Sequence, residues 1–250
     1  MRTRTKALGV LLISLLLVTV AMASVREEFH KTYPLSAGGS VSVNNVNGAV
    51  RIYTWDRNEV EVVAVKSADS ESKLRDCNID VYASSSRVEI KTKYAQHFFN
   101  NNPANVEYRI NVPKNTRIDK AETVNGDVEI SGTGSEVRAE TVNGSVHVND
   151  ASGDLKLNTV NGSLHATLGR TDHSVRMESV NGSVELTLPA NADASIEAST
   201  VNGNVSNGFG LDVERPKYGP GAKMHGRLGN GRASIKLESV NGSVNIRKGV

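Results

Sequence analysis

The tripeptide Val-Asn-Gly occurs seven times in this sequence, and its spacing limits the folds that the chain can adopt. From Asn125 onward, successive copies are separated by 18, 18, 20, 21 and 39 residues. Apolar-x-apolar triplets lie inside this period, and their leading residues recur every nine positions from Val128 to Leu164. Self-similarity at a fixed period is the signature of a repeat architecture. The sequence therefore predicts one small structural unit that is used many times.

Each triplet predicts a short β-strand with one buried face, because side chains on a strand alternate between its two faces. Gly and Asn, which favour turns, stand between the triplets. This pattern gives 18 predicted strands, which are centred near Val41, Val50, Val60, Ile79, Val88, Tyr108, Ile118, Val128, Val137, Val146, Leu155, Leu164, Val175, Val184, Ile196, Val205, Ile235 and Val244.

Two all-β folds can use such strands. Asn-Gly between strands favours a type I′ hairpin, which would give an antiparallel meander. The alternative is a parallel β-solenoid (β-helix) with a nine-residue half-period and 18-residue coils. The solenoid is favoured because stacked coils require the same residue types to return at the same phase. Nine coils stacked at ~4.8 Å would form a rod of roughly 40–45 Å.

Stacking would place equivalent residues in columns along the solenoid. Basic residues recur five positions before the asparagine of each repeat, and acidic residues recur three positions before it. The asparagines would form a ladder in which side-chain amides bond from coil to coil. Glycine after each asparagine would permit positive φ at the corner. The predicted ladder consists of Asn125, Asn143, Asn161, Asn181, Asn202 and Asn241, with Asn47 at the terminal coil.

The first 23 residues have the pattern of a secretory signal peptide. Basic residues precede an apolar run from Ala7 to Val20, and Ala21-Met22-Ala23 offers a cleavage site before Ser24. An uncleaved anchor is the alternative, but the run is shorter than the ~20 residues that span a bilayer. We therefore predict a secreted or periplasmic protein with no membrane span after cleavage.

The remaining chain, 24–250, is predicted to be a single β-solenoid domain with insertions at about 66–76, 95–105 and 207–232. It carries 26 basic and 27 acidic residues, which gives no electrostatic reason to expect nucleic-acid binding. The one cysteine, Cys77, excludes an intramolecular disulfide and a cysteine-based zinc site.

Several segments together carry a family resemblance. They are the repeat unit Glu-Thr-Val-Asn-Gly-Asp-Val-Glu-Ile, the run Val106 to Pro113 and the run Leu186 to Asp193. The set resembles the bacterial putative-adhesin family with β-strand repeats, a domain of unknown function, over most of residues 40–250. The resemblance implies an extracytoplasmic β-solenoid and provides no catalytic residues to carry over.

Two histidines and two glutamates form a candidate metal site. His147 and His165 share one phase with Glu129 and Glu185, so the four would line one strip. Such side chains can bind zinc or copper. A solvated face is the favoured interpretation, and the nonapeptide signature of calcium-binding solenoids is missing from the sequence. We therefore predict no structural metal and no cofactor, so a chelator should leave the melting temperature unchanged.

The predicted function is that of a non-enzymatic adhesion or interaction scaffold in the bacterial envelope. The alternative is a carbohydrate-active β-helix enzyme, which would need carboxylates that converge in one cleft. The segment 207–232 is Gly-rich, with five basic and two acidic residues, and loops on a regular scaffold often carry function. It could instead cover the side or end of the solenoid. The candidate binding residues, for an unidentified acidic glycan or envelope protein, are Phe209, Tyr218, Met224, His225 and Arg227.

Overall fold

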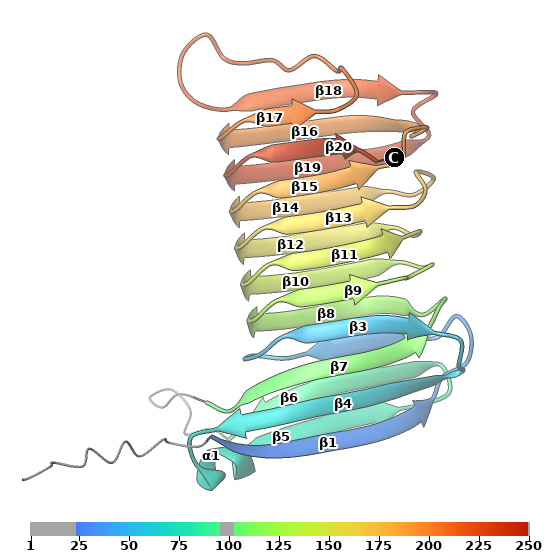
Figure 1. Cartoon of the computed structure of the whole chain (residues 1–250), viewed down its shortest axis with the longest axis vertical. Coiled ribbons are helices and arrows are strands. Elements are labelled where there is room, and N and C mark those ends of the chain that lie inside the picture. The colour runs from blue at the N-terminus through green and yellow to red at the C-terminus, as the bar shows by residue number, and fades with distance from the viewer. Residues whose placement is uncertain (1–23, 96–102, 250) are drawn as a thin grey trace, which may run out of the picture.

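The structure, a computed structural model, describes residues 24–95 and 103–249, which form two ten-stranded sheets and one short helix. The predicted signal peptide lies outside the described residues. Strands of the two sheets alternate along most of the chain, so the backbone winds into stacked coils (Figure 1). The prediction of a parallel β-solenoid is confirmed for the repeat region.

The first sheet, sheet A, contains in spatial order β1 (Val25–Pro34), β4 (Glu59–Ala68), β7 (Asn105–Pro113), β3 (Val50–Trp55), β9 (Val128–Ser131), β11 (Val146–Ala151), β13 (Leu164–Leu168), β15 (Val184–Leu188), β20 (Val244–Lys248) and β17 (Val205–Asn207). Sheet B contains β18 (Ala222–Leu228), β16 (Ala194–Asn202), β19 (Ala233–Asn241), β14 (Val175–Asn181), β12 (Leu155–Asn161), β10 (Val137–Asn143), β8 (Arg117–Asn125), β2 (Ser40–Asn44), β6 (Arg87–Tyr94) and β5 (Cys77–Ala83). The helix α1 spans Glu71–Arg75.

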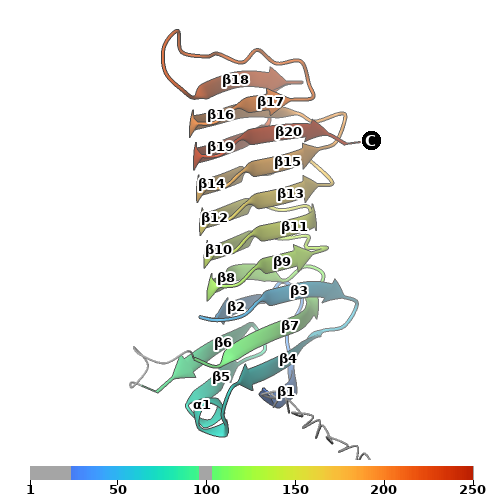
Figure 2. The ribbon, with the colours of Figure 1, turned by 60° about the vertical axis from the view of Figure 1, so that its left-hand side comes forward.

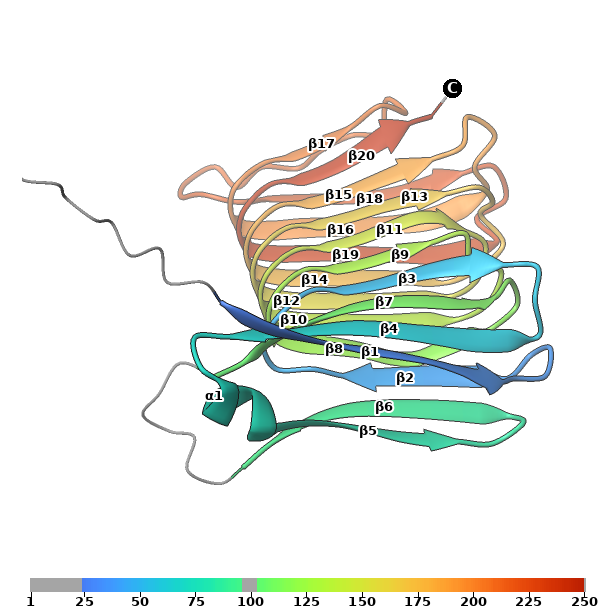
Figure 3. The ribbon, with the colours of Figure 1, turned by 60° about the horizontal axis from the view of Figure 1, so that its bottom comes forward.

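A regular coil consists of a sheet B strand, a Val-Asn-Gly corner and a sheet A strand. Neighbouring coils pair in parallel and in register, so that Arg138 lies beside Lys156 and Asn143 lies beside Asn161. Alternate side chains point inward between the sheets, which face each other in Figure 3. The core is therefore a stack of Val, Leu, Ile and Ala layers, as the low aromatic content requires.

All 18 predicted strands are present, but not all of them belong to coils. The strands at Val60 and Ile79 are β4 and β5, which pair antiparallel with their neighbours. Within the described residues there are therefore eight coils rather than the nine expected. Antiparallel pairing occurs at the two ends of the solenoid, where β1, β4, β5 and β18 complete the sheets.

Two strands, β1 and β18, are absent from the predicted set. Apolar residues of β1 recur every fourth position, at Val25, Phe29 and Tyr33, so the period-two signal is diluted. The strand β18 lies within the segment 207–232, which the sequence interpretation treats as a loop. Of the other expected insertions, 66–76 forms the end of β4 and α1. Residues 96–102 of the third lie outside the described residues.

The spatial order of the coils differs from their order in the sequence at both ends (Figure 2). The coil β2–β3 lies between β6–β7 and β8–β9. Likewise, the last coil of the chain, β19–β20, lies between β14–β15 and β16–β17. The long segment between Asn202 and Asn241 therefore contains β18 and the connection that brings the chain back between two earlier coils.

An ion pair between Asp193 and Arg232 lies where the chain enters its last coil, β19–β20. The Asp193 carboxylate accepts hydrogen bonds from Arg232 Nε at 2.6 Å and from the Arg232 backbone N–H at 3.1 Å. The Ala233 N–H donates to the Asp193 carbonyl at 3.1 Å. These hydrogen bonds from Arg232 hold the pKa of Asp193 below its usual value. Ionised Asp193 is therefore part of the folded state.

Replacing Asp193 should make stability less dependent on pH. A carboxyl group whose pKa is lowered on folding stabilises the protein above its unfolded pKa, near 4, and this contribution disappears as pH falls through the folded pKa. Asp193→Ala should therefore lower the melting temperature at neutral pH, and the difference from the parent protein should shrink on acidification. Asp212→Ala, at an exposed carboxylate, is the control. A difference for Asp193→Ala that stays constant down to about pH 2 would contradict this role.

Candidate functional site

The asparagines of the repeat lie in one column at the Val-Asn-Gly corners. In spatial order the column runs Asn47, Asn125, Asn143, Asn161, Asn181, Asn241 and Asn202. From the second member onward, each side-chain Nδ2 donates to the Oδ1 of the preceding asparagine at 2.8–2.9 Å. Asn47 is half-buried and the other six asparagines are exposed, so the ladder is solvated along most of its length.

A second ladder, inside the same corners, was missed by the sequence interpretation. Thr141 Oγ1 donates to the Gly126 carbonyl at 2.9 Å, and Thr159 Oγ1 donates to the Gly144 carbonyl at 2.9 Å. Thr123, Ser179, Ser239 and Thr200 make the equivalent bond. The sequence signal is a Thr or Ser two positions before every ladder asparagine from Asn125 onward. Both ladders satisfy polar groups of the corner, which gives Val-Asn-Gly a structural role.

Substitution within the ladder should cost more at its middle than at its end. Within the ladder, Asn143 both donates to Asn125 and accepts from Asn161, whereas Asn47 only accepts, from Asn125. Asn143→Ala is therefore expected to lower the free energy of unfolding by about 1–2 kcal/mol and Asn47→Ala by about half as much, since an exposed hydrogen bond contributes ~0.5–1.5 kcal/mol. Urea denaturation of both variants measures the difference. Equal losses would argue against a cooperative ladder.

The histidine strip lies on the outer face of sheet A. The rings of His147 and His165 stack with centroids 4.9 Å apart and an angle of 3° between their planes. His165 Nδ1 lies 4.0 Å from a Glu185 carboxylate oxygen, and Arg247 pairs with that carboxylate at 2.8 Å. Partial burial, and then the neighbouring His147, lower the pKa of His165. The described part of the chain contains no group of three or more His, Cys, Asp or Glu side chains that could hold a metal ion.

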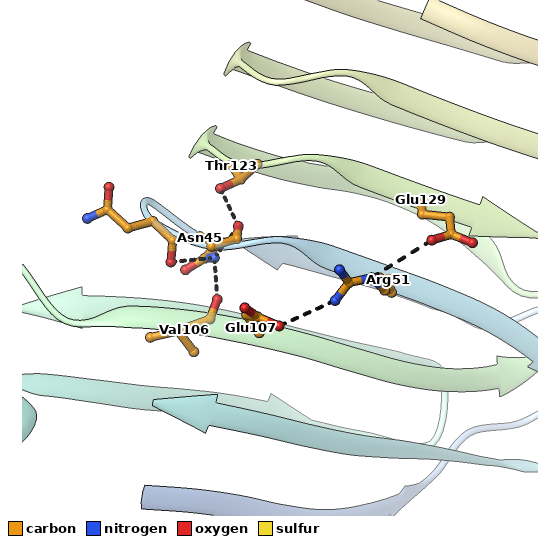
Figure 4. Close-up of polar contacts among 8 residues, drawn as sticks. Asn45, Arg51, Val106, Glu107, Thr123 and Glu129 are labelled. Atoms are coloured by element: carbon orange, nitrogen blue, oxygen red, sulfur yellow. Dashed lines mark hydrogen bonds and ion pairs between the residues drawn. The ribbon is translucent and has the colours of Figure 1, made fainter. Parts of the chain in front are cut away.

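The same column continues toward the N-terminal end as an ion-pair chain, shown in Figure 4. Arg51, on the coil that is inserted out of order, lies 3.5 Å from Glu107 and 3.8 Å from Glu129. Arg51 thus pairs with both neighbouring strands, β7 and β9. Because all three side chains are solvated, these pairs contribute ~0–1 kcal/mol each.

A buried amide fixes the corner of this inserted coil. Asn45 is 4% exposed, and the two hydrogens of its Nδ2 are shared among the carbonyl oxygens of Asn47, Gly48 and Val106, which lie 2.9–3.1 Å away (Figure 4). Its Oδ1 accepts from Thr92 Oγ1 at 2.9 Å. Asn45 therefore satisfies the backbone where the coil order changes. This network accounts for these polar groups without a ligand.

Cys77 is fully buried in the N-terminal end of the core. Burial raises the pKa of its thiol to about 11. The thiol is therefore protonated at neutral pH, and the thiolate that reacts as a nucleophile or binds a metal is disfavoured.

The five candidate binding residues of 207–232 are split between the core and the surface. Met224 is 0% exposed, so it has no surface to offer a partner and its place among the candidates is corrected. Phe209 is partly buried against the core, with Lys248 Nζ 5.9 Å from its ring centroid. Tyr218 is 82% exposed, and His225 and Arg227 lie on the exposed face of β18.

The segment also closes the C-terminal end of the solenoid. Phe209, Leu211 and Val213 pack against the core, and Asn207 Oδ1 accepts hydrogen bonds from the Phe209 and Leu211 N–H groups. The strand β18 pairs along its length with β16. Segment 207–232 is therefore a cap, the alternative that the sequence left open, and it presents an exposed polar face.

A surface depression runs across six strands of sheet B beside the corners. Its floor lies over the Thr and Ser residues of the second ladder, whose hydroxyls point inward, and Lys156 also contributes to its lining. One wall is the column of valines that precede the ladder asparagines. The other wall consists of polar residues two positions earlier. We call this depression the valine furrow. It has a volume of about 680 Å³, and no sequence argument identified it.

One protein family and several solved structures are similar to this chain. Residues 31–247 match the family described as Toastrack DUF4097. A Clostridium sporogenes structure described as a "putative cell adhesion protein" is 15% identical, with a TM-score of 0.49, over 89% of this chain and 100% of that one. A Bacteroides fragilis structure described as a "putative adhesin" is 14% identical, with a TM-score of 0.41, over 89% and 97%. A comparison with curated proteins gives no match. Among the described residues, no helix is long and apolar enough to cross a membrane.

Proposed function

This chain belongs to the Toastrack DUF4097 family, and we propose that it is a non-enzymatic adhesion or interaction scaffold on the extracytoplasmic side of a bacterial envelope. The N-terminal pattern of basic residues, apolar run and small-residue cleavage site supports export. Family membership alone names no activity, so the proposal depends on the surface of the solenoid.

The observation that carries the proposal is the even distribution of charge along the coils. Acidic side chains of sheet B lie in a line with a Lys or Arg two residues before them, as in the pairs Lys120–Glu122 and Lys236–Glu238. Glycoside hydrolysis uses two carboxylates that lie on either side of the glycosidic bond. Acidic side chains in a straight column along the outer face cannot lie on both sides of such a bond. A long, repeated and largely self-neutralised surface suits contact with an extended partner.

The exposed face of the C-terminal cap is a second contact surface in this proposal. Lys223, His225 and Arg227 alternate along β18 and point to solvent, and Lys217 lies beside the exposed Tyr218. A basic strip next to an aromatic ring suits an acidic group on a protein or glycan. Deleting the whole segment would remove β18 from sheet B, so point substitutions are the appropriate test.

The test uses the mature chain, 24–250, as bait on solubilised envelopes of its native host. We expect it to capture a partner, and we expect His225→Ala combined with Arg227→Ala to reduce capture several-fold. His30→Ala with Lys31→Ala, on the edge strand β1, is the matched control and should have no effect. Equal capture by the two double variants would move recognition away from the cap. Cleavage of an envelope polysaccharide by the purified chain would contradict the scaffold and support the enzyme alternative.

A further inference from the structure

The valine furrow exposes apolar surface that the fold does not require. Val142, Val160, Val180 and Val240 are 39–40% exposed, and Val201 is 58% exposed. Seven large apolar side chains are exposed in residues 24–95 and 103–249, and five of them are these valines. Contiguous apolar surface of this kind marks an interaction site more often than scattered exposed residues do.

The opposite wall of the furrow consists of one polar side chain from each strand, and all of them except Asn158, whose Oδ1 is buried, are hydrogen-bond acceptors at the surface. In spatial order, from the N-terminal end, the wall consists of Glu122, Glu140, Asn158, Glu178, Glu238 and Ser199. Neighbouring strands are ~4.8 Å apart, so the polar side chains and the valine methyl groups both recur at that interval. The furrow is therefore a periodic site with one apolar and one polar wall.

The charges beside the furrow cancel. The adjacent outer column of sheet B contains Lys120, Arg138, Lys156, Arg176, Lys236 and Glu197. Together with the furrow wall, this gives five basic and five acidic side chains. Lys120, Arg176 and Lys236 each pair with the furrow glutamate on the same strand. A neutral surface that is rich in acceptors gives no preference for a charged ligand.

We propose that the valine furrow binds an uncharged, extended polysaccharide chain. A sugar ring has an apolar C–H face, which fits against the valines, and hydroxyl groups at its edge, which donate to the glutamate carboxylates and the serine hydroxyl of the opposite wall. An extended polymer that lies along the furrow crosses one strand every ~4.8 Å, so its repeating units meet equivalent residues. The proposal rests on the proposed function, because it names a partner class for the scaffold, but it assigns a surface other than the basic face of β18.

Two other occupants fit the furrow less well. A lipid chain would cover the valines but would form no hydrogen bonds with the polar side chains of the opposite wall. A second copy of this protein would need about 800 Å² from each partner for a stable interface. Six strands span only ~24 Å, and the furrow is two side-chain rows wide, which is well below that area. Both occupants are outcomes of the experiment below.

The experiment is native affinity electrophoresis of the mature chain in gels containing galactomannan, mixed-linkage β-glucan or dextran. We expect at least one of these uncharged polysaccharides to retard the protein. Oligosaccharides of that polysaccharide should compete better with increasing length until they cover the six strands of the furrow, which span ~24 Å. Failure of all three polysaccharides to retard the folded protein would overturn the proposal.

Matched variants assign the binding to the furrow. Val160→Lys, which fills it, should weaken binding about ten-fold or more, whereas Thr167→Lys, on the exposed face of the next strand of the same coil, should change it less than about two-fold. Glu140→Leu with Glu178→Leu should weaken binding comparably, while Glu140→Gln with Glu178→Gln, which retains acceptors, should preserve most of it. Circular dichroism checks that every variant is folded.

Other outcomes would refute the polysaccharide assignment. Retardation that Val160→Lys leaves unchanged would place binding elsewhere. Loss on Val160→Lys of binding to polylysine or phosphatidylcholine vesicles, without polysaccharide binding, would indicate a cationic or lipid ligand. A dimer that Val160→Lys dissociates in sedimentation equilibrium would indicate a second copy. If capture from envelopes survives Val160→Lys but fails with His225→Ala and Arg227→Ala, the furrow is not the binding site, whereas the proposed scaffold function still holds.

Discussion

A chain of residues 24–230 is expected to melt far below the chain 24–250, although it keeps seven of the eight described coils and β18. The missing coil, β19–β20, hydrogen-bonds to the coils on both of its sides. It also contributes Ile235, Leu237, Val244 and Ile246, which are 0–2% exposed. At ~1.5–3 kcal/mol for each buried side chain, their loss removes about 6–12 kcal/mol, similar to the whole stability of many domains.

The control is an internal deletion of about the same number of residues. Removing residues 144–161 takes out one coil and joins Asn143 to Gly162, which restores a Val-Asn-Gly corner in phase. Because repeat proteins are stabilised by nearest-neighbour contacts, this shorter solenoid should remain folded with a modest loss. Thermal unfolding followed by circular dichroism compares the two proteins. Equal melting temperatures would show that β16–β17 moves into the empty position beside β14–β15.

The strands and the repeat length of the coils could be predicted from the sequence, because both depend on residues that are close together in the chain. Alternating apolar residues specify which side chains face inward, and corner residues specify where a strand ends. The order of the coils could not be predicted, because the repeats are nearly equivalent. Asn241 donates the ladder hydrogen bond to Asn181, and Asn202 in the same position would be able to donate the same bond. The Asp193–Arg232 connection and the pairing of β18 with β16 hold the observed order, in which β19–β20 lies between β14–β15 and β16–β17.

The candidate site was predictable in part for a related reason. Composition identified 207–232 as basic and aromatic, but it did not show that Met224 faces the core while His225 and Arg227 face solvent. The strand alternation of Ala222, Met224 and Leu228 is visible once β18 is known. The furrow was overlooked because the valine of Val-Asn-Gly suggests core, although its phase places it outward, beside an inward Thr or Ser.

The glycine of the corner is expected to be the least replaceable residue of the repeat. A Cβ atom on Gly162 would lie 1.9 Å from the Gly144 carbonyl oxygen, and one on Gly182 would lie 1.9 Å from that of Gly162. The sequence interpretation attributed these glycines to positive φ, yet Gly144, Gly203 and Gly242 do not have it. The property that all corners share is the close approach of one backbone to the next.

Gly162→Ala should therefore lower the free energy of unfolding by about 3–5 kcal/mol, near the upper end for single substitutions. The clash is with backbone, so the two coils must separate. The bonds from Gly162 N–H to the Asn181 carbonyl and from Thr159 Oγ1 to the Gly144 carbonyl would then weaken.

Gly219→Ala is the control, since a Cβ there meets no atom within 4 Å and its φ of +89° adds only backbone strain. That strain should cost about 1–2 kcal/mol. Urea unfolding of both variants measures the two losses under one set of conditions. If Gly162→Ala cost no more than Gly219→Ala, the coils could not be in backbone contact at the corner, and both the asparagine and hydroxyl ladders that depend on that contact would have to be revised.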